Sequence, residues 1–60
     1  FRRSLYITQN MKAGELLTEE NLRCIRPGMG LPPKYLEHLV GRRVNVDVLT
    51  GTPMSWELLS

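Results

Sequence analysis

Arg26 is the strongest candidate for a ligand-binding residue in this 60-residue chain. It ends a predicted strand and precedes Pro27, whose ring restricts the residue before it to extended conformations. Gly28 and Gly30 add no side-chain bulk to the approach. A guanidinium held in this way suits carboxylate, phosphate, or sugar carbonyl and hydroxyl oxygens. We predict that Arg26 binds a substrate, the alternative being a solvated arginine before a tight turn. The loop-shaping residues are predicted to be Pro27, Gly28 and Gly30.

The chain offers few groups for catalysis. Its one histidine, His38, falls on the solvent face of a short predicted helix, and its one cysteine, Cys24, alternates in phase with core-forming Leu22. Glu19 and Glu20 are adjacent and point apart, so they form no carboxylate pair for acid–base work. Neither a Cys/His cluster nor a phosphate-binding glycine motif is present. The sequence therefore predicts no catalytic residue, no metal ligand and no bound cofactor in this chain.

Other basic and aromatic residues have simpler interpretations. Arg42 and Arg43 follow the predicted end of a helix, where basic side chains are typical of a solvated face that complements the helix dipole. Trp56 is interpreted as a plug in the core or between domains.

Short strands position these groups. Residues 4–8 and 22–26 are rich in β-branched, aromatic and other apolar residues, and both segments are predicted to be strands. Val44, Val46 and Val48 alternate with polar residues, which predicts the clearest strand of the chain.

Short helical segments complete the predicted elements. Pro33 is well placed to open a helix whose apolar positions recur at helical spacing, and Gly41 is placed to end it. Thr18 and Ser55 are each predicted to cap a single helical turn, since hydroxyl side chains accept hydrogen bonds from the first amides of a helix.

An internal repeat relates the two ends of the chain. Residues 11–18 align with residues 48–55 at an offset of 37 positions, so that Gly14 falls on Gly51 and Thr18 on Ser55. A duplication in so short a chain predicts a pseudo-symmetric domain whose unduplicated middle is free to carry function. The expected fold class is mostly β with short helical turns and an internal pseudo-twofold.

Size and charge limit the possible functions. A chain of this length buries only ~60% of its unfolded surface, and its core supplies roughly 3–5 kcal/mol. The net charge of +2 is mild, and the chain lacks the dense basic stripe of a nucleic-acid binder. It also lacks a signal peptide and an apolar run long enough for a membrane span. We expect a single cytoplasmic domain, residues 1–60, excised from a larger protein, with neither nucleic acid nor membrane as a partner.

An ordered set of short motifs resembles one family. Residues 3–6, 12–15, 17–22 and 25–30 are similar, in this order, to the C-terminal antifreeze-like (SAF) domain of sialic acid synthases. Residues 33–35, 39–41 and 51–56 continue the resemblance, which covers essentially the whole chain. The motifs are most similar to the bacterial pseudaminic acid synthase branch.

The resemblance implies a β-clip fold and a role inside an enzyme. Such synthases are transferases that condense phosphoenolpyruvate with an N-acetylated amino sugar in an N-terminal (β/α)8 barrel, using a divalent metal held by the barrel. The SAF domain of one subunit lies over the active site of its neighbour in a homodimer. The arginine of its Arg-Pro-Gly motif, here Arg26, reaches the sugar. Met29, Leu31 and Trp56 are candidates for contact with the barrel.

Two other functions are compatible with this fold. A free-standing ice-binding protein of the type III antifreeze kind is one, although its flat, uncharged binding face has no use for Arg26. A SAF module of pilus or flagellar assembly proteins is the other.

Overall fold

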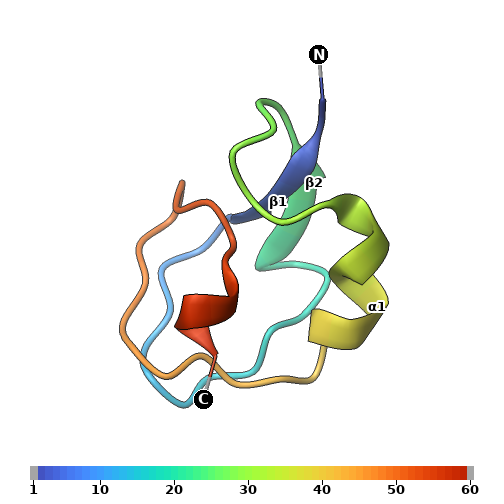
Figure 1. Cartoon of the computed structure of the whole chain (residues 1–60). Helices are drawn as coiled ribbons and strands as arrows, with labels where there is room; N and C mark the ends of the chain where they lie inside the picture. The colour runs from blue at the N-terminus through green and yellow to red at the C-terminus, as the bar shows by residue number, and fades with distance from the viewer. Residues whose placement is uncertain (1, 60) are drawn as a thin grey trace.

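The computed structural model describes residues 2–59 and is built from short strands, single bridges and short helical turns (Figure 1). Its elements are β1 (Ser4–Ile7), β2 (Leu22–Ile25), the 3-10 helix η1 (Pro33–Tyr35), α1 (Leu36–Leu39) and the 3-10 helix η2 (Trp56–Leu58). The two strands are antiparallel, with Ser4 opposite Ile25 and Ile7 opposite Leu22. Both predicted N-terminal strands and the helix that Pro33 opens are confirmed. No helix in this part of the chain is long and apolar enough to cross a bilayer.

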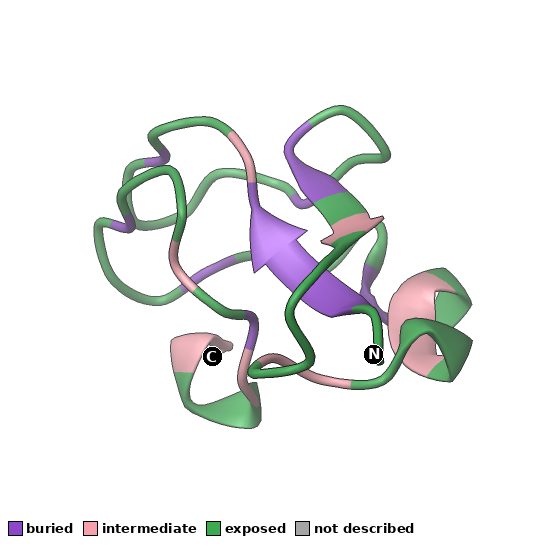
Figure 2. Cartoon of the chain, turned by 90° about the horizontal axis from the view of Figure 1, so that it is seen from above, coloured by how far each residue is buried: buried purple, intermediate pink, exposed green. Residues whose placement is uncertain are grey.

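One hydrophobic core joins the two strands to α1 and to the repeated segments. All four residues of β1 are buried, so the strand is covered on both faces (Figure 2). The core residues are Leu5, Ile7, Met11, Leu17, Leu22, Leu39, Val44, Val48 and Met54. A two-stranded sheet is marginal by itself in water. Burial of these apolar side chains, worth about 25 cal/mol per Å² of apolar surface, therefore stabilises the fold.

The predicted internal symmetry appears in the backbone pairing. Met11 and Val48, which the repeat aligns with each other, form an antiparallel bridge, and each amide donates to the other's carbonyl at 2.7 and 2.8 Å. The pseudo-twofold axis therefore passes between these two residues. The remaining bridges fall into pairs related by the same offset: Leu16–Arg43 with Tyr6–Pro53, and Ile7–Leu22 with Val44–Leu59.

The two aligned glycines occupy equivalent turns. Gly14 has a φ of 94° and Gly51 a φ of 91°, in the left-handed region that favours glycine. The Gly14 amide donates to the carbonyl of Val44 at 2.8 Å. The Gly51 amide donates at 2.7 Å to Ile7, the residue aligned with Val44. The repeat therefore encodes a shared scaffold, and features that differ between the two halves are candidates for function.

The predicted strand through residues 44–48 was wrong. Val44 and Val48 are buried and each forms a single bridge, but Val46 is 45% exposed. The amide of Asn45 donates to Leu58 at 2.7 Å, and its side chain donates to Leu59, also at 2.7 Å. No continuous neighbouring strand pairs with this segment within residues 2–59, so the chain bends outward between its two buried valines.

Thr18 makes the predicted capping hydrogen bonds, but on a turn at residues 19–21 and not on a helix. Thr18 Oγ1 accepts hydrogen bonds from the amides of Glu20 and Asn21, at 3.2 and 3.3 Å. Ser55, by contrast, makes no side-chain cap before η2, so that prediction was wrong. In this single 3-10 turn the amide of Leu58, which a capping hydroxyl would bind, donates instead to the carbonyl of Ser55 at 3.2 Å.

Candidate functional site

Arg26 leaves the end of β2 with its side chain exposed. The peptide bond that joins it to Pro27 is cis. Within residues 2–59 its guanidinium takes part in no hydrogen bond and no ion pair. Its hydrogen-bond donors are thus available to a ligand that approaches from outside this part of the chain.

Ser4 fixes the loop that follows Arg26. Its hydroxyl donates to the carbonyl of Pro27 and accepts from the amide of Gly30, both at 2.9 Å. Ser4 is 2% exposed, so its hydroxyl is shielded from water and is satisfied by these two bonds. The repeat aligns Ser4 with Gly41, which has no hydroxyl, so the bonds belong to this loop and not to the shared scaffold. Sequence reasoning missed Ser4, although a serine at the start of an otherwise apolar strand is a signal that could have drawn attention.

The two loop glycines allow the backbone to approach its neighbours closely. A Cβ at Gly30 would lie 2.1 Å from the carbonyl oxygen of Leu5 and 2.9 Å from the amide nitrogen of Met54. A Cβ at Gly28 would lie 2.9 Å from the Cβ of Arg2. In Figure 1 the loop accordingly folds back beside the N-terminal end of β1. This close packing is a different physical reason for glycine from the open approach to Arg26 that the sequence suggested.

A shallow hollow of about 290 Å³ lies beside this loop. It is lined by Arg2, Arg3, Ser4, Gly28, Gly30, Pro32 and Pro33. The structure thus brings two of the predicted loop-shaping residues together with two arginines that sequence reasoning did not select.

Comparisons with known protein families, sequences and structures identify the family of this chain. A family model described as the SAF domain matches residues 2–60. The chain belongs to the SAF domain family. The pseudaminic acid synthase of Campylobacter jejuni is 41% identical over 51 residues, which cover 85% of this chain and 15% of that protein.

Two solved structures share the fold. The spore coat polysaccharide biosynthesis protein SpsE of Bacillus subtilis matches 97% of this chain and 17% of its own, with a TM-score of 0.87 and 31% identity. The antifreeze-protein-like domain of human N-acetylneuraminic acid phosphate synthase matches 95% of this chain and 73% of its own, with a TM-score of 0.84 and 29% identity. The resemblance to SAF domains of the sialic acid synthase family, including the pseudaminic acid branch, is confirmed. This SAF domain spans less than a fifth of the synthase and of SpsE.

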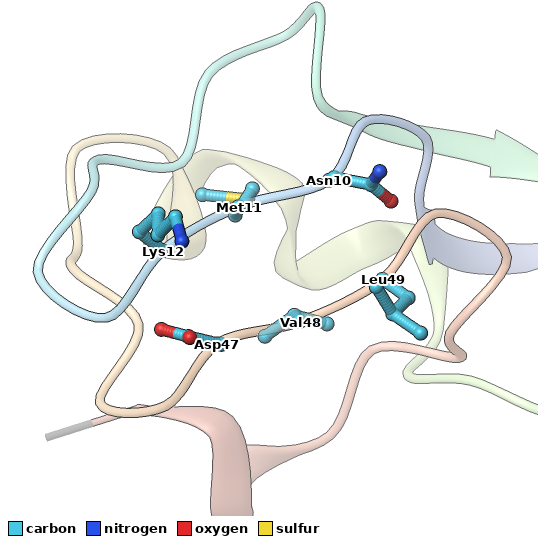
Figure 3. Close-up of a pocket in the computed structure, with 6 residues that line it drawn as sticks. All are labelled: Asn10, Met11, Lys12, Asp47, Val48 and Leu49. Carbon is cyan, nitrogen blue, oxygen red and sulfur yellow. The ribbon is translucent and has the colours of Figure 1, made fainter.

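A second hollow of the SAF domain, of about 310 Å³, lies on the pseudo-twofold axis (Figure 3). It is lined by Asn10, Met11, Lys12, Asp47, Val48 and Leu49. Asn10 Oδ1 accepts a hydrogen bond from the amide of Thr50, and its aligned partner Asp47 Oδ1 accepts from Ala13, both at 2.8 Å. These equivalent bonds show that Asn10 and Asp47 stabilise the two turns. We therefore interpret this hollow as a structural feature of the repeat and not as a ligand site.

Other side chains selected from the sequence lie away from the Arg26 loop or have structural partners. His38 is exposed, and Cys24 is half-buried against the core. Arg42 and Arg43 are both exposed, and Arg43 Nη1 donates to the carbonyl of Gly14 at 2.6 Å. No three His, Cys, Asp or Glu side chains gather as a metal site in the described part of the SAF domain.

Trp56 does not fill the core of this domain, so only its other interpretation, a plug between domains, stays a prediction. It is 47% exposed, and its ring meets Tyr35 edge-on with 5.1 Å between centroids. Met29 is 73% exposed, while Leu31 packs against the core. Exposed aromatic and methionine side chains are characteristic of protein interfaces.

Proposed function

We propose that this SAF domain caps the active site of a nonulosonic acid synthase and that Arg26 contacts the acceptor sugar. The synthase is a transferase that condenses phosphoenolpyruvate with an N-acetylated amino sugar. Catalysis takes place in a (β/α)8 barrel, and this domain binds and orients the sugar. The observation that carries the proposal is Arg26 itself, an exposed guanidinium without an internal partner on a loop pinned by Ser4.

The proposed division of labour has a simple physical basis. A (β/α)8 barrel opens its active site at the C-terminal ends of its strands. A cap excludes water there and supplies a hydrogen-bond donor to the bound substrate. A loop held by Ser4 suits this task because little backbone freedom is lost on binding. The divalent metal of the synthase would be held by the barrel.

The barrel of the neighbouring subunit in a homodimer is the proposed partner. Met29 and Trp56 expose apolar surface that a partner would cover, at 73% and 47% of their full areas. Covering this surface would add buried apolar area to a small core, and so would stabilise the domain. Such burial is a reason for a domain of this size to form part of a larger protein.

Replacing Arg26 by alanine in the full synthase tests the proposal. Loss of one charge-assisted hydrogen bond costs about 1.5–3 kcal/mol, or roughly one to two orders of magnitude in kcat/KM. We expect this loss to appear mainly against the amino sugar, with a much smaller change for phosphoenolpyruvate.

Arg42→Ala is the matched control, since it removes another exposed arginine outside the loop. Its kcat/KM should stay close to that of the wild type, and both variants should remain dimers by size-exclusion chromatography. If Arg26→Ala has wild-type activity, the proposed sugar contact is wrong. The domain would then act as a stabilising or dimerising module.

A further inference from the structure

The hollow beside the loop has the character of a separate ligand subsite. Arg26 does not line it; Arg2 and Arg3 do, from the segment before β1. Its volume of about 290 Å³ is at the small end of ligand pockets, which suits one functional group of a ligand better than a whole large molecule.

The hollow is electrostatically one-sided. Two arginines are among its lining residues, and no acidic residue is. The hydroxyl hydrogen of Ser4 is already donated to Pro27. The remaining side-chain donors at the hollow are therefore the arginines, whose planar forks match oxyanions.

The internal repeat has no counterpart of this basic pair. At the offset of 37, Arg2 and Arg3 align with Leu39 and Val40. Leu39 lies in α1 and is buried, whereas Arg2 and Arg3 precede β1 and are exposed. The basic pair therefore belongs to one half of the chain alone, on its surface and outside the core.

The register of the sheet brings the hollow close to Arg26. Ser4 lies opposite Ile25, so Arg3 precedes this pair on one strand and Arg26 follows it on the other. Both arginines therefore leave the same end of the two-stranded ladder. The loop from Pro27 to Gly30 follows Arg26 directly and is held by hydrogen bonds to Ser4, the neighbour of Arg3.

We propose that the Arg2–Arg3 hollow binds a phosphate or carboxylate group of a small ligand, next to the site of Arg26. The guanidiniums supply the charge-assisted hydrogen bonds, and the rigid walls formed by Pro32 and Pro33 limit the loss of freedom on binding. This subsite is independent of the proposed sugar contact. If both exist, a ligand with a sugar-like part and an anionic part spans them.

A phosphate titration of the 60-residue chain tests the subsite. The amides of residues 2–4 and 28–30 are followed by ¹⁵N–¹H NMR while sodium phosphate replaces sodium chloride at constant ionic strength. We expect saturable shifts at these amides with a Kd on the order of 1 mM. A parallel titration with sodium acetate separates the two ligand chemistries, since saturation with phosphate alone identifies a phosphate site.

Glutamine variants test whether Arg2 and Arg3 bind the phosphate. The double variant Arg2→Gln/Arg3→Gln should bind phosphate at least about fivefold more weakly, whereas Arg42→Gln should change the Kd less than about twofold. Well-dispersed spectra confirm that each variant is folded. Shifts that never saturate, or that persist unchanged in the double variant, would mean adventitious anion association only and would overturn the proposal. Because the readout is binding and not turnover, its result is distinguishable from that of Arg26→Ala in the synthase.

Discussion

Gly30→Ala is expected to unfold most of the chain under conditions in which the wild type is folded. The added Cβ would lie 2.1 Å from the carbonyl oxygen of Leu5, a backbone atom that cannot rotate away. Three backbone hydrogen bonds meet at this point, linking Leu5 to Leu31, Leu31 to Met54 and Met54 to Leu5, each at 2.9 Å. Relief of the collision requires these segments to separate.

The size of the effect follows from the small core. Three backbone hydrogen bonds at 0.5–1.5 kcal/mol each amount to about 2–4 kcal/mol. The core of a chain this small supplies only roughly 3–5 kcal/mol in total. Urea unfolding followed by the fluorescence of Trp56 measures the loss directly.

Two other glycines provide graded controls. Gly14→Ala meets no atom within 4 Å but keeps a φ of 94°, so it should cost only about 1–2 kcal/mol from backbone strain. Gly28→Ala meets the Cβ of Arg2 at 2.9 Å, outside the sheet, and an intermediate effect is expected. A Gly30→Ala unfolding free energy within about 1 kcal/mol of the wild type would show that the loop tolerates displacement, and would contradict the close-packing explanation.

Ser4→Ala should release the loop that follows Arg26. The substitution leaves the carbonyl of Pro27 and the amide of Gly30 without their buried partner. Each polar group left without its partner costs about 1–3 kcal/mol, so we expect a total loss of about 2–6 kcal/mol. Faster hydrogen exchange at the Gly30 amide, beyond the global change in stability, would report the loosened loop specifically.

Ser4→Cys and Thr8→Ala distinguish the hydrogen bonds from general damage to the strand. The cysteine preserves most of the volume but bonds weakly, so it should lie between wild type and alanine. Thr8 Oγ1 donates to the carbonyl of Glu20 at 2.8 Å in an exposed position, and its removal should cost less than about 1 kcal/mol. Equal losses for Ser4→Ala and Thr8→Ala would refute the assigned role of Ser4. In the full synthase, Ser4→Ala should also raise the KM for the amino sugar if Arg26 acts as proposed.

Local sequence signals were sufficient for much of this fold. β1 and β2 are short runs of residues suited to strands, and Pro33 fixed the start of the helical segment because its restricted φ favours a first helical position. Gly14 and Gly51 marked two turns that both require a positive φ. The repeat that aligns them also predicted the pseudo-twofold, because similar segments adopt similar turns and bury similar side chains.

Residues 44–48 and the loop after Arg26 are the two places where local sequence patterns did not predict the structure. Alternation from Val44 to Val48 predicts a strand only if a partner strand lies alongside, and the folded chain places single bridges there instead. Ser4 acquires its role from residues 23 and 26 positions away, a separation that no local pattern contains. Gly30 likewise faces backbone atoms of Leu5 and Met54, which come together only in the folded chain. The sequence alone therefore indicated which residue types make the proposed ligand-binding loop. Long-range hydrogen bonds and steric contacts determined how that loop is held, because they exist only once distant segments pack against one another.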